Sequence, residues 1–549
     1  MLVSFIVSAD VTDVYGLNIL ASQLKKLESQ NVKVQSFYIF YDFNKLYPQS
    51  VMDDLTHFCK GSDLIGISLL SSAYRNSIHI TNHLRKRIDC PIIWGGKHPT
   101  IDPDDCIQHA DMVVIGEGED TMLELVDAMN SGRSYDQTLG TWIRHNGTVI
   151  KNEKRPLEQN LDKYLFPDYS IENKFVLDTR KMRIKPMKSS DLKHMENWYP
   201  TMITRGCPFR CAFCTNNKDL RKMRSRSIGN VVTEIKEFLK IHPSTKRIFF
   251  RDDALTSMSM EFIEKLSSAL KEINLPFTCS GVMSSTPKFK EKLTLLRNAG
   301  FVGVKMGIQS GCERVRREVH TRPESNKTIV WGASVLNSLK FDKINYYMIT
   351  DNPYESEDEL VESIRFTSRL PRPFSLSLFS LNFYPGTALY CRALQDGIIK
   401  NKEETLQEST MVFKNNYLNK IFLLLRYLEL PPKLVEYLTN KAVYTKPKFQ
   451  KLFNAIWRYF FNTDDCRRGL EPPRRKYFKV LLSNRDVKGF FNNIVKFNWL
   501  WWFILSESFS FYHRKFITPP VVKDGLAIEP KVLNKIDSTL QTADRPRAS

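Results

Sequence analysis

The sequence predicts an α/β protein with three successive parts: an N-terminal doubly wound, flavodoxin-like (Rossmann-like) sheet, a partial (β/α)6 barrel and a mostly helical C-terminal region. Between residues 2 and 130, five short apolar runs alternate with amphipathic stretches, as in a parallel sheet with helices on both faces. A second series of six runs spans residues 201–383, fewer than the eight units of a closed barrel. Beyond about residue 400 the strand pattern stops.

These changes of pattern give the predicted boundaries. Residues 1–140 form the sheet domain, and the polar, proline-containing residues 141–197 are expected to form a linker or lid. The barrel follows over 198–400. Residues 401–535 form a helical, basic, aromatic-rich domain, and 536–549 a tail.

The composition fits a globular chain with several cores. Of the 549 residues 42% are hydrophobic, and the net charge is +20. From Asn401 onward there are 26 Lys and Arg against 14 Asp and Glu, so much of the excess is C-terminal. Ten cysteines are too few for a disulfide scaffold, and the N-terminus does not have the segments of a signal peptide. A cytoplasmic location is therefore expected.

The basic C-terminal region is open to three interpretations. Aromatic residues alternate with Lys and Arg over 474–479 and 497–515. Such a pattern suits a helical cap that lines a substrate cavity, an interfacial helix on an anionic membrane, or an RNA-binding surface. The most apolar run, Phe497–Leu505, is far shorter than the roughly 20 residues that a spanning helix needs. We expect at most peripheral membrane contact, at the inner face, and nucleic acid is not expected as a partner.

Three closely spaced cysteines carry the sharpest chemical signal. Cys207, Cys211 and Cys214 follow the first predicted barrel strand in the run TRGCPFRCAFC. Thiolates are the ligands of iron-sulfur clusters, and three of them on a four-iron cluster leave one iron open to a small molecule. Gly206 and Pro208 argue against the alternative of three core cysteines on one helix. A zinc site would need a fourth ligand, and the nearest histidine, His194, precedes the strand.

This run resembles the CxxxCxxC signature of the radical S-adenosylmethionine (SAM) superfamily. The resemblance implies that the three cysteines hold a 4Fe-4S cluster whose open iron binds SAM, and that an electron then splits SAM into methionine and a 5′-deoxyadenosyl radical. It also implies SAM contacts by five further residues: Phe213 before the last cysteine, Asp252 and Asp253 after the second strand, and Gln309 with Ser310 after the fourth. Gln309 stands where glutamate is more usual, and an amide also bonds a ribose hydroxyl.

The turns of the N-terminal domain resemble those of the cobalamin-binding domain found in one branch of this superfamily. They follow consecutive strands as Ser68-Leu-Leu70, Gly95-Gly96-Lys-His98 and Gly116-Glu117-Gly118. Small residues there let a flat corrin approach the backbone. The alternative is an empty Rossmann-like domain. The D-x-H-x-x-G motif that supplies a lower cobalt ligand in mutases is absent. His98 either approaches the corrin or is an exposed turn histidine.

The resemblance implies a methyltransferase of the class B type, which methylates an unactivated carbon with a 5′-deoxyadenosyl radical and cobalamin. A ring-forming cyclase with the same cofactors is the first alternative. A tRNA methylthiotransferase is the second, although Cys59, Cys90 and Cys106 are poorly placed for its additional cluster. A binding protein with a decayed catalytic core is the third. The expected partners are a small-molecule or lipid-like substrate and an electron donor such as ferredoxin or flavodoxin.

Overall fold

The computed structural model describes residues 1–9, 14–42, 45–216, 221–402, 405, 413–427 and 430–460. Phe497–Leu505, the tail and most of the predicted C-terminal domain lie outside these residues. The described residues form two compact units. The first takes in those within Met1–Gly281, Leu295–Val302 and Asn382–Ser409, and the second takes in the rest.

The N-terminal sheet has nine strands in the order β7-β6-β5-β4-β3-β1-β2-β8-β9. Its five inner strands are parallel, which confirms the predicted flavodoxin-like order 2-1-3-4-5. They are β1 (Leu2–Val7), β2 (Lys33–Tyr38), β3 (Leu64–Ser68), β4 (Ile92–Gly95) and β5 (Met112–Val114).

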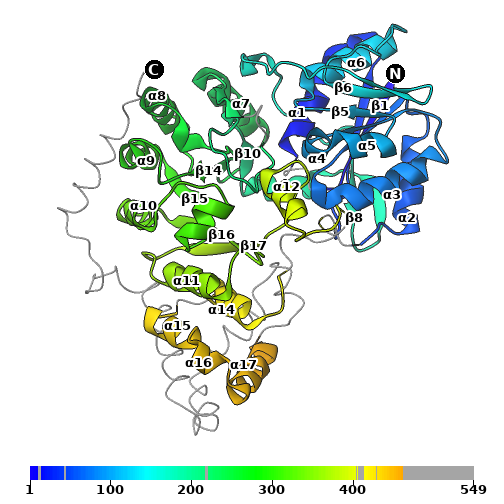
Figure 1. The fold of residues 1–549 in the computed structure, drawn as a ribbon. Coiled ribbons are helices and arrows are strands. Elements are labelled where there is room, and N and C mark those ends of the chain that lie inside the picture. The colour runs from blue at the N-terminus through cyan, green and yellow to red at the C-terminus, as the bar shows by residue number, and fades with distance from the viewer. Residues whose placement is uncertain are drawn as a thin grey trace, which may run out of the picture. The chain divides into compact units, whose positions relative to one another are not determined.

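Helices cover both faces of this sheet (Figure 1). Helix α1 packs against α6 on one face, while α2, α3 and α5 bury apolar side chains against the other. Their bounds are α1 (Tyr15–Leu24), α2 (Gln49–Cys59), α3 (Tyr74–Arg85), α4 (Lys97–Ile101), α5 (Pro103–His109) and α6 (Glu119–Asn130).

The segment 141–197, expected to be an irregular linker or lid, contributes four strands to the edges of the sheet. They are β6 (Thr141–His145), β7 (Thr148–Lys151), β8 (Lys174–Asp178) and β9 (Arg183–Pro186). Asn146 and Gly147, which join β6 to β7, have φ values of 47° and 80°. Positive φ at both positions is typical of a tight hairpin turn, and Asn-Gly is its usual sequence.

The second sheet has six strands in the order β10-β13-β14-β15-β16-β17, with parallel pairing. Six strands confirm the predicted partial barrel. They are β10 (Tyr199–Thr201), β13 (Ile248–Phe250), β14 (Phe277–Val282), β15 (Phe301–Gln309), β16 (Lys343–Thr350) and β17 (Ser375–Ser380). A separate antiparallel hairpin consists of β11 (Thr204–Arg205) and β12 (Arg224–Ser225).

A helix follows each of the six barrel strands along the chain. These helices are α7 (Ile228–Ile241), α8 (Met260–Lys271), α9 (Phe289–Asn298), α10 (Asn326–Ser338) and α11 (Glu357–Ser368), and α12 (Ala388–Gln395) comes after β17. Hydroxyl side chains cap most of them by accepting a backbone N–H of the first turn, which is the usual preference at helix starts. The caps are Ser227, Ser259, Ser325, Ser356 and Thr387.

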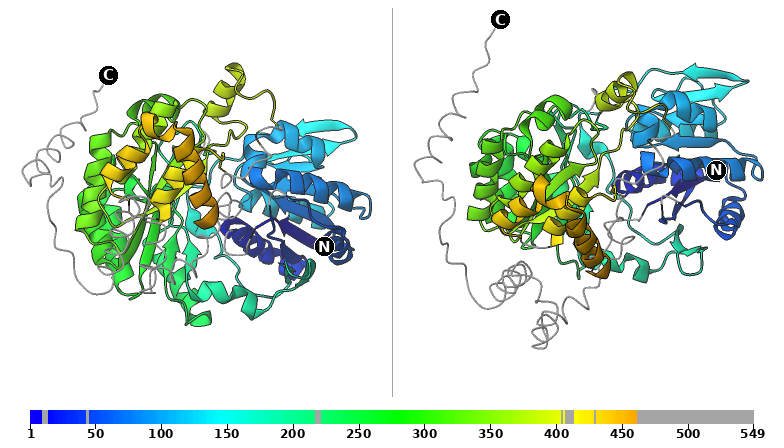
Figure 2. Two further views of the ribbon diagram at one scale, coloured as in Figure 1. Left: turned by 90° about the horizontal axis from the view of Figure 1, so that it is seen from below. Right: turned by 60° about the horizontal axis from the view of Figure 1, so that its bottom comes forward.

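Four further helices belong to the second unit: α14 (Tyr417–Tyr427), α15 (Pro432–Leu438), α16 (Lys441–Tyr444) and α17 (Pro447–Phe460). Helices α14 and α15 pack against α11, and Figure 2 shows them in yellow and orange. Short 3₁₀ segments are Lys25–Gln30, Ser71–Ala73, Leu161–Lys163, Ser189–Glu196 and Leu255–Ser257, and Val315–Val319 is a π-helical turn. Among the described helices, none combines the length and the apolar character needed to cross a bilayer.

Candidate active site

The cysteine loop leaves the barrel through the β11–β12 hairpin. Gly206, with φ of 98°, turns the chain directly before Cys207. Cys207, Cys211 and Cys214 are partly exposed and form no disulfide. The backbone N–H of Cys214 donates to the carbonyl of Cys211 at 3.1 Å, so the last two cysteines lie on one tight turn. Three thiols on a single, partly exposed loop fit the ligand set of an iron-sulfur cluster.

The thiols lie close enough to affect one another's ionisation. Burial raises the pKa of Cys207 to about 11, and the nearby charges of Asp253, Cys211 and Cys214 act in the same direction. Iron would displace the thiol proton, because metals bind the thiolate. The backbone N–H of Asn216 points to the Sγ of Cys214 at 3.5 Å. Such N–H to sulfur bonds tune cluster potentials.

Two neighbouring carboxylates after β13 hold the two ends of this loop. Asp252 is buried, and its Oδ1 accepts the N–H groups of Ile203 at 3.1 Å and Thr204 at 2.6 Å. Burial raises the pKa of Asp252 to about 6. Asp253 Oδ2 accepts the side-chain amide of Asn216 at 3.0 Å. The pair therefore fixes the chain before Cys207 and after Cys214.

Gln309 and Ser310, predicted to contact SAM, belong to the second unit. Ser310 is buried, and its hydroxyl lies 3.0 Å from that of Ser363 and 3.2 Å from Glu355 Oε1. Gln309 ends β15 with φ of 72°, and its amide covers Gly307, since a Cβ there would lie 2.6 Å from Gln309 Nε2. The SAM contacts of Phe213, Asp252, Asp253, Gln309 and Ser310 stay predictions.

The predicted cobalamin turns lie together at the carboxyl ends of β3, β4 and β5. Gly96 has φ of 104°, and a Cβ there would lie 2.9 Å from the carbonyl of Leu69, so only glycine fits. Leu70, after β3, exposes 54% of its surface although it is apolar. Gly116 has φ of 94° and open space where a Cβ would point. An exposed apolar side chain beside bare backbone fits the flat face of a corrin. The contacts of Ser68, Leu70, Gly95, Gly96, Gly116, Glu117 and Gly118 stay predictions.

His98 is fully buried, so its interpretation as an exposed turn histidine is wrong. Its Nδ1 lies 3.0 Å from the hydroxyl of Ser71, and its Nε2 is a buried atom that makes no hydrogen bond. Burial lowers the pKa of His98 to about 4, and the charge of Lys402 acts in the same direction. The imidazole is therefore neutral at physiological pH. A role toward cobalamin stays a prediction.

A lysine from far along the chain completes the surroundings of His98. Donor atoms of His98, Asp105 and Cys106 lie within 4.8 Å of one another, as in a metal site. However, Lys402 Nζ forms an ion pair with Asp105 at 3.0 Å and another with Asp102. An ammonium group already neutralises these carboxylates, so the three donors do not indicate a metal site.

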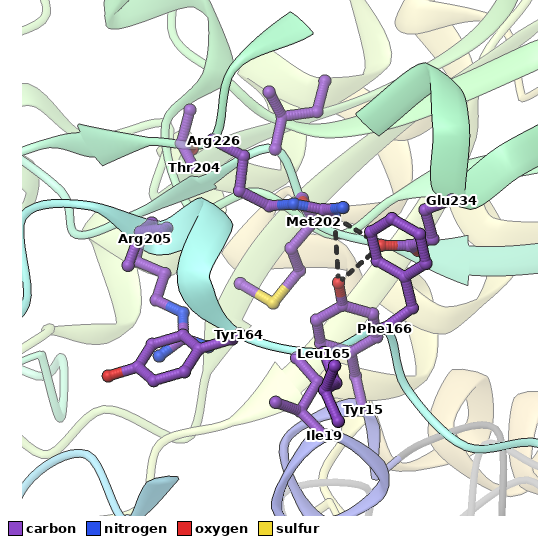
Figure 3. Close-up of a pocket in the computed structure, with 12 residues that line it drawn as sticks. Tyr15, Ile19, Tyr164, Leu165, Phe166, Met202, Thr204, Arg205, Arg226 and Glu234 are labelled. Atoms are coloured by element: carbon purple, nitrogen blue, oxygen red, sulfur yellow. Dashed lines mark hydrogen bonds and ion pairs between the residues drawn. The ribbon is translucent and has the colours of Figure 1, made fainter. Parts of the chain in front are cut away.

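Figure 3 shows a small cavity where Tyr15, from α1, meets the barrel side chains Arg226 and Glu234. Arg226 forms an ion pair with Glu234 at 2.5 Å and donates to the Tyr15 hydroxyl at 3.2 Å. The cavity volume is about 20 Å³, which suffices for one water molecule. It is too small for a substrate, and its buried charges instead tie α1 to the barrel.

Three charged residues around the predicted sites were not predicted from the sequence: Arg205, Arg224 and Lys402. Both arginines bind Glu117 of the predicted cobalamin turn, across up to 107 residues of sequence. A lone arginine on a short strand carries no sequence signal for such a contact.

Two family models match this chain. The B12 binding domain matches residues 3–126, and the Radical SAM superfamily matches residues 201–367. The uncharacterized methyltransferase PH0819 of Pyrococcus horikoshii is 26% identical over 397 residues, which cover 70% of this chain and 79% of that protein. Cytidylyl-2-hydroxyethylphosphonate methyltransferase of Streptomyces wedmorensis is 25% identical over 399 residues, covering 67% and 73%.

A further relative is the anaerobic magnesium-protoporphyrin IX monomethyl ester cyclase of Rubrivivax gelatinosus, 27% identical over 261 residues that cover 46% of this chain and 44% of the cyclase. Among solved structures, the cobalamin-dependent S-adenosylmethionine radical enzyme OxsB shares the fold, with a TM-score of 0.61, 14% identity, and coverage of 90% of this chain and 81% of OxsB. The chain is therefore an enzyme of the cobalamin-binding radical SAM family, with a 4Fe-4S cluster, SAM and cobalamin as its cofactors.

Proposed function

We propose that this enzyme is a methyltransferase that methylates an unactivated carbon of a small-molecule substrate. The observation that carries the proposal is the accessible loop of Cys207, Cys211 and Cys214 in a chain that also has a B12 binding domain. With the cofactors bound, SAM would supply the 5′-deoxyadenosyl radical on receiving an electron from the cluster, and cobalamin would supply the methyl group. The two methyltransferase relatives described above each cover two thirds or more of this chain, which supports methyl transfer.

The residues of the chain have separate tasks in this proposal. Cys207, Cys211 and Cys214 hold the cluster. Asp252 and Asp253 fix the ends of their loop, because Asp252 accepts backbone N–H groups before it and Asp253 accepts Asn216 after it. The bare turns at Gly96 and Gly116 leave room for the corrin. The cluster must be reduced, so we propose a low-potential donor such as ferredoxin or flavodoxin.

Anaerobic reconstitution with iron, sulfide and hydroxocobalamin tests the proposal without a known substrate. Reduction in the presence of SAM should release 5′-deoxyadenosine. Methyl transfer through cobalamin consumes a second SAM and should release S-adenosylhomocysteine only when cobalamin is present. Cys207→Ala, Cys211→Ala and Cys214→Ala should each abolish the first product. Cys391→Ala, an exposed cysteine outside the loop, is the matched control.

A ring-forming cyclase is the second candidate, and the cyclase relative favours it. It covers 46% of this chain, less than either of the two methyltransferases described above. A cyclase needs no methyl donor, so it would release 5′-deoxyadenosine without S-adenosylhomocysteine. That result would replace the methyltransferase proposal, whereas a protein that stays colourless after reconstitution would exclude both.

A further inference from the structure

Four charged side chains connect the predicted cobalamin turn to the hairpin that carries the cysteine loop. Arg205 ends β11, Arg224 begins β12, and these two residues, the arginine pair, face each other directly across the hairpin. Cys207 follows two residues after Arg205. Glu117 and Glu119, the glutamate pair, come from the turn after β5 and the first turn of α6. All four residues belong to the first unit.

The contacts between the two pairs are short and involve both carboxylates. Arg224 donates to both oxygens of Glu117, at 2.6 and 2.9 Å. Arg205 donates to Glu119 Oε1 at 2.7 Å and lies 3.3 Å from Glu117 Oε1. The Arg224 side chain is only 2% exposed and that of Glu119 only 7%. Solvent therefore screens these contacts weakly.

The hairpin depends on the glutamate pair for electrostatic reasons. Two like charges directly opposite each other destabilise an antiparallel pair of strands. A buried guanidinium without a partner is costlier still. Burial alone would raise the pKa of Glu117, but the hydrogen bonds of Arg224 and the charges of both arginines lower it. The Glu117 carboxylate is thus ionised, and its negative charge offsets the positive charges of the arginine pair at the base of the cysteine loop.

Each arginine makes a second contact, which restricts the orientation of its guanidinium group. Arg224 also donates to the backbone carbonyl of Glu158 at 2.8 Å. The guanidinium of Arg205 lies 5.3 Å from the ring centroid of Tyr164, whose hydroxyl donates to Asp120 at 2.9 Å. The arginine pair is thus fixed by groups of the N-terminal 170 residues. We therefore expect a shift of the turn at Gly116–Gly118 to move the hairpin as well.

We propose that Glu117 and Glu119 are positioning residues for the cysteine loop, and that Glu117 transmits corrin binding at the turn Gly116–Gly118 to the iron-sulfur cluster instead of contacting the corrin itself. The inference rests on the cofactors of the proposed function and names a task that the resemblance does not assign. It replaces the predicted corrin contact of Glu117.

Glu117→Gln tests this proposal because it keeps the shape and removes the charge. The cluster spectrum by electron paramagnetic resonance, with and without hydroxocobalamin, is the main readout. In the wild type, corrin addition should change this spectrum, and in the variant that response should be lost. Release of 5′-deoxyadenosine should fall about 10- to 100-fold, as for other residues that orient metal ligands. The dissociation constant of hydroxocobalamin should change less than about threefold, well under the tenfold that 1.4 kcal/mol represents.

The matched control is Glu124→Gln on α6, which also removes an ion pair with an arginine, Arg155, but at a half-exposed side chain. It should behave as the wild type. If Glu117→Gln does not fold, Arg205→Lys gives the same information, since it keeps the charge and loses the two-pronged geometry of the guanidinium. It should retain iron but show an altered cluster spectrum.

The opposite pattern overturns the inference. If Glu117→Gln or Arg205→Lys leaves the cluster spectrum and its response to corrin unchanged, the glutamate pair has no positioning task. Weaker hydroxocobalamin binding with an intact cluster would restore Glu117 as a corrin contact. None of these readouts needs methyl transfer, so a wild type that makes no S-adenosylhomocysteine would refute the proposed function and leave this comparison valid.

Discussion

At the scale of single residues, Glu355 is expected to make stability depend on pH. Burial raises its pKa to about 7, and hydrogen bonds from Ser363 and Ser310 only partly oppose the effect. In an unfolded chain a glutamate has a pKa of about 4.3. The folded state therefore binds the proton more tightly, and the stability that this group contributes is complete below about pH 4.3 and is lost as pH rises through 7.

Glu355→Gln removes this titration while keeping a polar side chain for the two serines. We expect the variant to melt above the wild type at pH 8 and together with it near pH 4.5, because only the ionised carboxylate is unfavourable. Melting temperatures of the cluster-free protein across this range measure the effect. Glu28→Gln, at an exposed position, is the control. A constant difference at every pH would contradict the assignment.

Gly281 tests the fit of the backbone beside Asp252. Its φ is 70°, and a Cβ would lie 2.5 Å from the amide nitrogen of Ala254 and 2.6 Å from the carbonyl of Asp252. Gly281→Ala should lower the free energy of unfolding by more than about 1 kcal/mol, because the conformation and the space both exclude a side chain. Gly229→Ala, with no atom within 4 Å of the added Cβ, should leave it unchanged or raise it slightly. Chemical denaturation of the two variants provides the comparison.

The sequence predicted some site residues and could not predict their partners. Cysteines on one loop and glycines after strands are local patterns that can be recognised without the fold. The contact of Arg224 with Glu117 joins positions 107 residues apart, and no local pattern encodes such a pair. The surroundings of His98 could not be predicted either, because they include Ser71 and Lys402, which are distant in the sequence.

At the scale of elements, the segment around α12 contacts two parts of the first unit. Gly386, with φ of 76°, approaches α4 so closely that a Cβ would lie 2.5 Å from the carbonyl of Ile101. The backbone N–H of Leu389 donates at 2.9 Å to the carbonyl of Ala212, between Cys211 and Cys214. Lys402 then pairs with Asp105 beside α4. The segment is therefore expected to stabilise the cysteine loop as well as the N-terminal domain.

Lys402→Met should show this dependence. It leaves Asp102 and Asp105 without their cation in a largely buried position, where breaking a pair costs about 3–5 kcal/mol. We expect a lower melting temperature and faster loss of iron from the reconstituted protein. Lys400→Met, on an exposed side chain two residues earlier, should change neither. Loss of stability without faster loss of iron would show that the segment around α12 does not stabilise the cysteine loop.

Elements were predictable where periodicity is local. The inner strands of the first sheet and the six barrel strands appear as apolar runs, and the structure confirms both sets. The edge strands β6 to β9 were not predicted, because short, half-exposed strands have weak hydrophobic periodicity. Asn146-Gly147 was the available signal for the first hairpin.

At the scale of the whole molecule, the iron content distinguishes the proposed function from a tRNA methylthiotransferase. A single three-cysteine loop predicts about four irons per reconstituted chain, whereas an additional cluster would give about eight. Cys59 and Cys106 are buried, and burial raises the pKa of both thiols, which disfavours them as ligands. Colorimetric iron analysis is sufficient. A value near eight would return the methylthiotransferase to consideration.

The order of domains was predictable from the sequence, but the two compact units were not. The first unit joins the N-terminal sheet to part of the barrel and to the segment around α12. Ion pairs such as Arg226 with Glu234 beside Tyr15 contribute to this arrangement, and contacts between distant segments leave no trace in periodicity. The limits at 140, 197, 400 and 535 stay predictions.

The β11–β12 hairpin, in which Arg205 faces Arg224, has a consequence for how such enzymes can exchange domains. A gene fusion that joined a new N-terminal domain to the old barrel would inherit two uncompensated guanidinium groups unless the incoming domain also carried acids after its fifth strand. Among homologues, the acidic and basic positions should therefore be gained or lost together. Chimeric enzymes with exchanged N-terminal domains should retain iron only when both sets come from compatible parents.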